Sequence, residues 1–222
     1  MKPDVNILPK YTKKEEIINS ITHLVGLVFA LGVLTFFIIF SMAKNLDFSY
    51  MLPYYVYVLS MMIVFGVSTA YHSSKFSSKT RAVLRVIDHS DIYFFVFGTY
   101  FPLCLYAISN QPIATTILIL QIIIMILGIV LSVIPCSSKI LDIISYVIYI
   151  VDGWMIIFFY PFGIGMEFLV FLFVLLGGFT YSLGAITYVI GSKRKYFHSI
   201  FHVFVVLAAV LQFIGIYFLL VK

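Results

Sequence analysis

Long apolar runs separated by short polar segments occupy almost the whole chain. Seven runs of about 20 residues or more can be delimited, at roughly 17–42, 52–71, 86–107, 113–133, 140–162, 168–190 and 197–221. Each is long enough to cross about 30 Å of hydrocarbon as a helix, at about 1.5 Å per residue. Backbone polar groups must be satisfied within the segment in lipid, and the runs are too long for barrel strands. The pattern predicts an all-α fold, a seven-transmembrane helix bundle over residues 16–222.

The composition supports a membrane protein. The chain has 222 residues, of which 63% are hydrophobic and 10% are charged, whereas a soluble domain carries about 25% charged residues. Apolar runs recur along the whole length, so the first is not read as a cleaved signal peptide before a soluble body. The two cysteines, Cys104 and Cys136, are too few for a disulfide framework and are expected to be small apolar fillers.

The net charge of +5 is best explained by membrane topology. The basic residues form short clusters between apolar runs, so no nucleic-acid partner is expected. With seven spans, twelve of the fourteen lysines and arginines fall on the side of the N-terminus, and only Lys44 and Lys222 fall on the other. The positive-inside rule then places the N-terminus, with a short tail at residues 1–15, in the cytoplasm and the C-terminus outside.

Histidines gather in the predicted cytoplasmic half of the bundle. A basic cluster at 193–195 runs directly into His198 and His202, which share one helix face because they are four residues apart. All five histidines lie in this half: His23, His72, His89, His198 and His202. Ionisable groups inside a membrane are costly and usually functional.

The arrangement suggests a zinc site made by His72, His198 and His202, which requires the ends of three spans to converge. Imidazole is a common metal ligand, and catalytic zinc typically keeps three protein ligands and one water. Asp88 is then the candidate for holding or deprotonating the metal-bound water. Ser68, one turn before His72, could orient the site or bond a substrate carbonyl.

The same residues also have less specific interpretations. A single histidine near a helix end is usually interfacial and hydrogen-bonded, which is the simpler interpretation of His23 and His89. Asp91 could support the site or merely face the bundle. Asp152 lies deeper in its run and needs a bundle-facing partner that the sequence does not identify.

Four motifs, in order and with their spacing, resemble a known family: Glu16-x2-Asn19-x2-Thr22-His23, Ser68-x3-His72, Asp88-His89-Ser90-Asp91 and His198-x3-His202. They are similar to those of the hemolysin III-like proteins, the bacterial branch of the progestin and adipoQ receptor (PAQR) family, which is grouped with alkaline ceramidases. The resemblance runs from about Glu16 to the end of the chain.

The resemblance implies a bacterial plasma-membrane protein in which His72, His198 and His202 bind Zn²⁺ and Asp88 lies beside the metal-bound water. It also implies that Glu16, Asn19 and His23 support the site.

Two classes of function fit these expectations. The first is a zinc-dependent, ceramidase-like hydrolase acting on a lipid amide or ester that enters sideways from the inner leaflet. The second is a non-enzymatic protein of membrane homeostasis, sensing or cytolysis, in which zinc staples three helices. The hemolysin name implies cytolysis, although no amphipathic insertion segment is evident. A transporter would need broken helices and internal repeats, and neither is clear in the sequence.

Overall fold

A computed structural model describes residues 9, 11–76, 78–133, 139–191 and 194–222. The described part is helical and contains no strand. Its elements are α1 (Lys13–Lys44), α2 (Phe48–Ser73), α3 (Lys79–Pro102), η2 (Leu103–Ala107), α4 (Gln111–Val133), α5 (Lys139–Gly153), α6 (Met155–Phe159), η3 (Tyr160–Phe162), α7 (Phe168–Gly191) and α8 (Phe197–Leu220).

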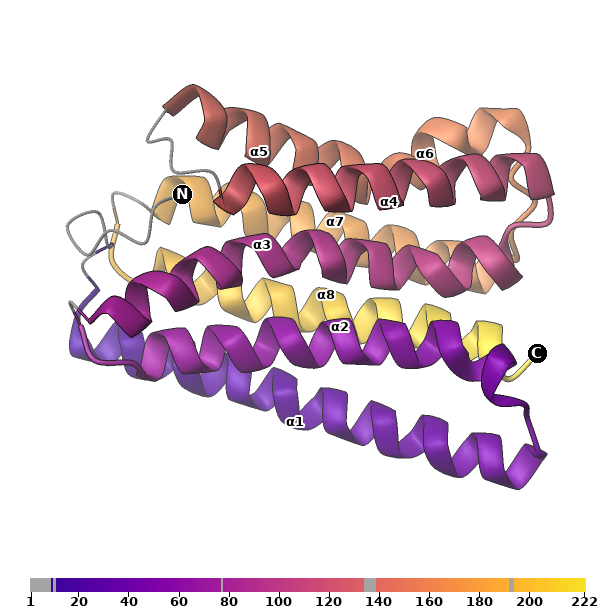
Figure 1. Cartoon of the computed structure of the whole chain (residues 1–222), viewed down its shortest axis with the longest axis horizontal. Helices are drawn as coiled ribbons and strands as arrows, with labels where there is room; N and C mark the ends of the chain where they lie inside the picture. Colours follow the sequence, from indigo (N-terminus) through magenta and orange to yellow (C-terminus); the bar gives the residue numbers. More distant parts are fainter. Residues whose placement is uncertain (1–8, 10, 77, 134–138, 192–193) are drawn as a thin grey trace.

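The long helices lie side by side and alternate in direction (Figure 1). The closest pairs are α7 with α8, α1 with α2, and α2 with α3, so most neighbours in sequence are also neighbours in space. In addition, α8 packs against α1. The last helix therefore lies beside the first, which brings the beginning of α1 and the beginning of α8 to the same end of the bundle.

Five of the described helices are long and apolar enough to cross a membrane, namely α1, α2, α4, α7 and α8. The helix α3 is more polar because Arg85, Asp88 and Asp91 lie on it, and α5 is only 15 residues long. The chain is thus a multi-pass membrane protein, as its composition indicated. The number of seven spans and the orientation of the termini remain predictions.

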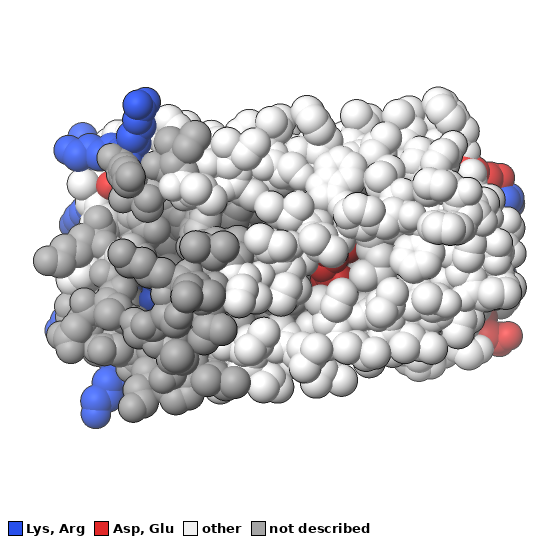
Figure 2. Space-filling view, turned by 90° about the horizontal axis from the view of Figure 1, so that it is seen from above, with Lys and Arg blue, Asp and Glu red and all other residues white. Residues whose placement is uncertain are grey.

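Charged side chains separate along the bundle axis (Figure 2). Lysines and arginines gather at the end where α1 begins, and the opposite end shows mainly acidic groups. Between the ends the visible surface is almost uncharged, with a few acidic atoms showing in the middle of this face. The band of uncharged surface is what a bilayer core requires.

The fifth apolar run is not one continuous helix. The sequence predicts one span over 140–162, but the structure ends α5 at Gly153 and continues with the short α6 and η3. Trp154 has φ −95° and ψ 8°, which interrupts the helix. Glycine is a poor helix former, and the polar side chain of Asp152 precedes it. Figure 1 shows α5 and α6 one after the other alongside α4, with their junction about halfway along the bundle.

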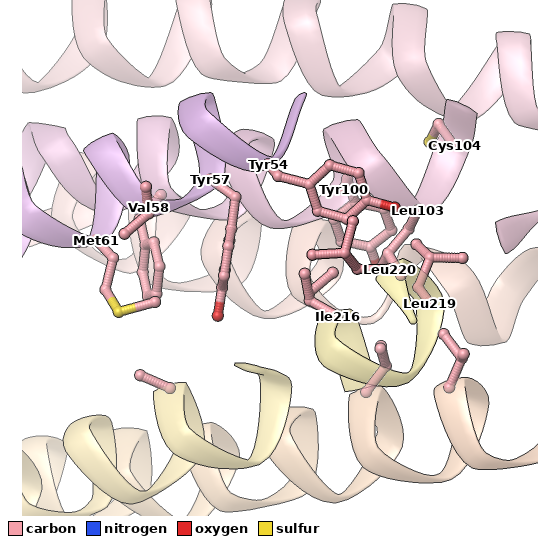
Figure 3. Close-up of a cluster of buried hydrophobic side chains, with 14 of the residues drawn as sticks. Tyr54, Tyr57, Val58, Met61, Tyr100, Leu103, Cys104, Ile216, Leu219 and Leu220 are labelled. Atoms are coloured by element: carbon pink, nitrogen blue, oxygen red, sulfur yellow. The ribbon is translucent and has the colours of Figure 1, made fainter. Parts of the chain in front are cut away.

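A cluster of buried apolar side chains packs between the helices in the interior of the bundle (Figure 3). Tyr54 and Tyr57 of α2, Leu103 of η2 and Ile216 of α8 are fully buried in it. The free thiol of Cys104 lies in the same cluster, which matches its predicted role as an apolar filler. Cys136 lies outside the described residues.

Candidate metal centre

Three buried histidines from two helices meet at the end of the bundle where α1 begins. His72 lies in the last turn of α2, whereas His198 and His202 lie in the first turns of α8. One ring nitrogen from each lies within 4.8 Å of the other two. The Nε2 atoms of His198 and His202 are 2.9 Å apart, and the ring of His72 is centred 4.8 Å from that of His202. The triad is therefore close enough to hold a metal ion.

Glu16 of α1 fixes the orientation of His72. Its Oε2 accepts a hydrogen bond from His72 Nδ1 at 2.7 Å. A carboxylate only accepts, so Nδ1 carries the proton and Nε2 keeps its lone pair. His72 Nε2 is buried and has no hydrogen-bond partner among the described residues. A histidine whose distal nitrogen is held by a carboxylate and whose other nitrogen is free is typical of a metal ligand.

Arg81 of α3 holds Glu16 from the other side. Its side chain is 1% exposed and forms an ion pair with Glu16 Oε1. The guanidinium also donates to the carbonyls of Tyr71 at 3.1 Å and Ser74 at 3.0 Å, where α2 ends. The chain Arg81–Glu16–His72 thus links α3, α1 and α2 and restrains the carboxylate to one position.

Asn19 connects α1 to α8 beneath the triad. Its side chain is fully buried, and Oδ1 accepts a hydrogen bond from Ser199 Oγ at 2.6 Å. Its Nδ2 lies 3.5 Å from His72 Nδ1. Ser199 immediately follows His198, so this contact sets the rotation of α8 that directs its two histidines toward His72.

Two rings enclose the triad. Tyr11, just before α1, stacks on His198 with centroids 4.7 Å apart and planes 14° apart. Burial raises the pKa of the Tyr11 hydroxyl above its ordinary value, so the ring is neutral at neutral pH. On the opposite side, His23 is centred 3.8 Å from the ring of His202. Both nitrogens of His23 are buried without a hydrogen-bond partner among the described residues.

The start of α8 is fastened to the start of α1. Thr12 and Glu15 form a capping box, in which Glu15 Oε2 accepts from Thr12 N at 2.8 Å. The other oxygen of Glu15 accepts from Tyr196 N at 2.8 Å. Tyr196 has φ +65° and directly precedes α8. The cap of the first helix therefore also determines where the last helix begins.

The carboxylate predicted to act on water lies on α3 beside the triad. Asp88 is largely buried, is 3.7 Å from His89 Nδ1, and interacts electrostatically with His23, His72 and His198. Ser68 Oγ, one turn before His72, is buried without a hydrogen-bond partner among the described groups.

The remaining predicted polar groups of α3 do not join the triad. The carboxylate oxygens of Asp91 are buried and unpartnered within the described part of the chain. The Nε2 of His89 lies 3.4 Å from the hydroxyl of Tyr188 on α7, and the carbonyl of His89 accepts from the Tyr149 hydroxyl. His89 is thus hydrogen-bonded, whereas His23, for which the sequence also predicted a hydrogen-bonded interfacial histidine, is buried without a hydrogen-bond partner among the described residues.

The donor set fits a zinc ion. Zinc takes neutral imidazole nitrogens at about 2.0–2.1 Å, so tetrahedral ligand atoms are about 3.4 Å apart. The widest separation here, up to 4.8 Å, closes to that value with side-chain shifts of about 1 Å. The unpartnered His72 Nε2 supplies a free lone pair at the centre.

Three residues that contact the triad or its supporting side chains were not predicted from the sequence. Arg81 belonged to a basic cluster, Tyr11 to the predicted tail, and Ser199 to an apolar run. The only signal was position: Ser199 lies between the two α8 histidines, and Arg81 opens the span that carries Asp88.

Residues 11–213 match the family described as haemolysin-III related. The chain belongs to this family. The hemolysin-3 homolog of Bacillus subtilis (strain 168) is 34% identical over 214 residues, covering 96% of this chain and 97% of that protein. The hemolysin-3 of Bacillus cereus is 32% identical over 206 residues, covering 92% and 91%. The resemblance inferred from the four motifs is thereby confirmed, and the family supports a multi-pass protein of the bacterial cell membrane.

Proposed function

We propose that this haemolysin-III related protein is a zinc-dependent hydrolase of a lipid amide or ester. The observation that carries the proposal is the buried triad of His72, His198 and His202. It is supported by the carboxylate of Asp88, whose charge acts on His72 and His198, and by the unpartnered hydroxyl of Ser68, one turn before His72 on α2. A zinc ion that only held helices together would need neither the carboxylate nor the serine hydroxyl. Zinc, when bound, would polarise a carbonyl and lower the pKa of a water toward about 7.

The side chains then have separate tasks. Asp88 accepts a proton from the attacking water and passes it to the leaving amine or alcohol, so that water and the amide or ester become an acid and an amine or alcohol. Ser68 donates a hydrogen bond to the developing oxyanion. Glu16 and Arg81 hold His72 in place, and Asn19 fixes the rotation of α8.

The membrane arrangement suits a lipid substrate. With seven spans and a cytoplasmic N-terminus, the triad lies just beneath the inner headgroups, because it shares the basic end of the bundle (Figure 2). Apolar side chains of α1 and α8 face outward near the site, including Ile17, Ile21 and Ile200, each more than 40% exposed. A lipid of the inner leaflet can therefore approach sideways without leaving the bilayer.

Two variants and a control test the proposal. Purified wild-type protein should contain about one zinc per chain and cleave a fluorescent ceramide. His202→Ala should lose zinc and turnover together, whereas Asp88→Asn should keep zinc and lose turnover by about 10²–10⁴-fold. His89→Ala is the matched histidine control for zinc content, which it should leave unchanged because His89 lies outside the triad; its turnover is not a control, since His89 also faces Asp88. Turnover that survives complete removal of metal would refute the proposal.

One observation favours the alternative function, in which zinc has no catalytic role and holds the helices together. The unpartnered ring of His23 packs on His202 and could serve as a fourth ligand, closing the coordination sphere. In that case His23→Ala would lower zinc affinity as strongly as His202→Ala does, and no lipid would be cleaved. A hydrolase would keep its zinc in His23→Ala.

A further inference from the structure

A second buried polar site lies at the break between α5 and α6. Asp152, in the last turn of α5, is 0% exposed, and neither of its carboxylate oxygens makes a well-aligned hydrogen bond with the described residues, although the Gln121 side chain lies close enough to act on the carboxylate. The α5–α6 junction that Asp152 adjoins lies well away from both ends of the bundle (Figure 1). An ionised carboxylate buried without compensation is strongly disfavoured, so something must neutralise it.

Among the described residues, no charged side chain acts on Asp152, whose surroundings act through burial and through Gln121. No lysine or arginine occurs on α4, α6, α7 or α8. Lys139, at the start of α5, is about 20 Å away along the helix. On α3, the groups on which the charge of Asp152 acts are the hydroxyls of Tyr93 and Tyr100, and these are neutral.

The polar groups around Asp152 are mostly used to cap the helix break. Gln121 Nε2 of α4 donates to the Asp152 carbonyl at 3.3 Å. The Tyr100 hydroxyl donates to the Gly153 carbonyl at 2.9 Å and accepts from Ile156 N at 3.1 Å. Trp154 Nε1 donates to Ser182 Oγ of α7 at 2.8 Å. These contacts hold the broken helix in one shape.

The oxygen atoms of the Gln121 and Asp152 side chains are the hydrogen-bond acceptors that remain at the helix break. Gln121 is fully buried, and because its amide nitrogen is engaged by the Asp152 carbonyl, its Oε1 is left without a partner among the described groups. Together with the two oxygens of Asp152 this makes three acceptors that lack a well-aligned hydrogen bond within the described part of the chain. A single proton on Asp152 could satisfy only one of the other acceptors, whereas a cation satisfies several at once.

We propose that Asp152 and Gln121 bind a monovalent cation, Na⁺, at the α5–α6 break. One carboxylate balances one positive charge, whereas a Ca²⁺ site usually gathers several carboxylates. Oxygen donors suit a hard cation. The C-terminal end of α5 adds partial negative charge, and a broken membrane helix commonly places such an end beside a bound cation.

The test is the thermal stability of the purified full-length protein as Na⁺ is exchanged for choline at constant ionic strength. Between 1 and 100 mM Na⁺ the unfolding midpoint should rise by about 3–5 °C, and K⁺ should act more weakly. In Asp152→Asn the rise should disappear. The control Asp47→Asn removes an exposed carboxylate that makes no capping hydrogen bond, and it should keep the full rise.

A further variant keeps the test decisive if Asp152→Asn does not fold. Gln121→Met preserves the size of the side chain but removes Oε1 together with the amide that donates to the Asp152 carbonyl. This variant should need about tenfold more Na⁺ for the same rise, which corresponds to about 1.4 kcal/mol. An unfolding midpoint that does not respond to Na⁺ in the wild type, or that responds equally in Asp152→Asn, would overturn the proposal. Zinc content should be unchanged in both variants, so this result is independent of the metal centre.

Discussion

His72 is the triad member whose position depends most on other residues. It lies alone on α2, whereas His198 and His202 support each other on one helix face. Its orientation rests on Glu16, which in turn is held by Arg81. Because the carboxylate of Glu16 accepts a hydrogen bond from Nδ1, the other ring nitrogen, Nε2, is left free to bind a cation.

Replacing Glu16 with Gln should weaken metal binding without abolishing it. The neutral amide keeps the shape but loses the charge that orients His72 and pairs with Arg81, so zinc affinity should fall by about 10–100-fold. Competition with a fluorescent chelator measures this fall. Glu167→Gln is the matched control, because Glu167 is half exposed and pairs with Lys222 at the other end of the bundle. Equal affinities in wild type and Glu16→Gln would contradict the role given to Glu16.

At the scale of the helices, α2 and α3 approach closely at Gly98. A Cβ at this position would collide with the Ser60 side chain and lie 3.4 Å from the Cα of Tyr57. The close contact draws α3, with Asp88 and Arg81, against α2, which carries His72.

Gly98→Ala should therefore destabilise the protein by about 1–3 kcal/mol, because the two helices must separate. Gly32→Ala is the control, since its Cβ meets nothing within 4 Å, and alanine favours a helix by about 1 kcal/mol over glycine. Thermal unfolding in detergent should show a lower midpoint than the wild type for Gly98→Ala but not for Gly32→Ala. Equal midpoints would show that the Gly98 contact is not tight.

The positions of the helices could be predicted from hydropathy, but their mutual arrangement could not. The apolar runs at 52–71 and 197–221 correspond to α2 and α8 within a few residues. The break after Asp152 was missed because the run around it remains apolar and only Gly153 interrupts it. Which helices touch depends on shape complementarity, such as that at Gly98, and on contacts distant in sequence.

The candidate site could be predicted only in part, because it too depends on how the helices pack against one another. The spacing of His198 and His202 places them on one face of a helix, but no local pattern shows that α8 lies against α1. Arg81 and Tyr11 gain their importance only from that packing, so neither could be distinguished from ordinary basic or aromatic residues near a helix end.

For the whole molecule, the separation of charge predicts orientation in the membrane. Lys195 lies at the basic end, and Lys44 lies at the other. In a chain without native cysteines, Lys44→Cys should react with an impermeant maleimide in intact cells, whereas Lys195→Cys should react only after permeabilisation. Labelling of both sites in intact cells would contradict the proposed topology.

The distribution of the triad between α2 and α8 has a consequence for biosynthesis. A ribosome delivers α2 early and α8 last, so a nascent chain that has inserted everything up to α7 possesses only one of the three imidazoles. Binding of an ion by all three imidazoles would therefore have to wait until α8 has been made, and chains that end anywhere before His198 would lack two of the three ring nitrogens.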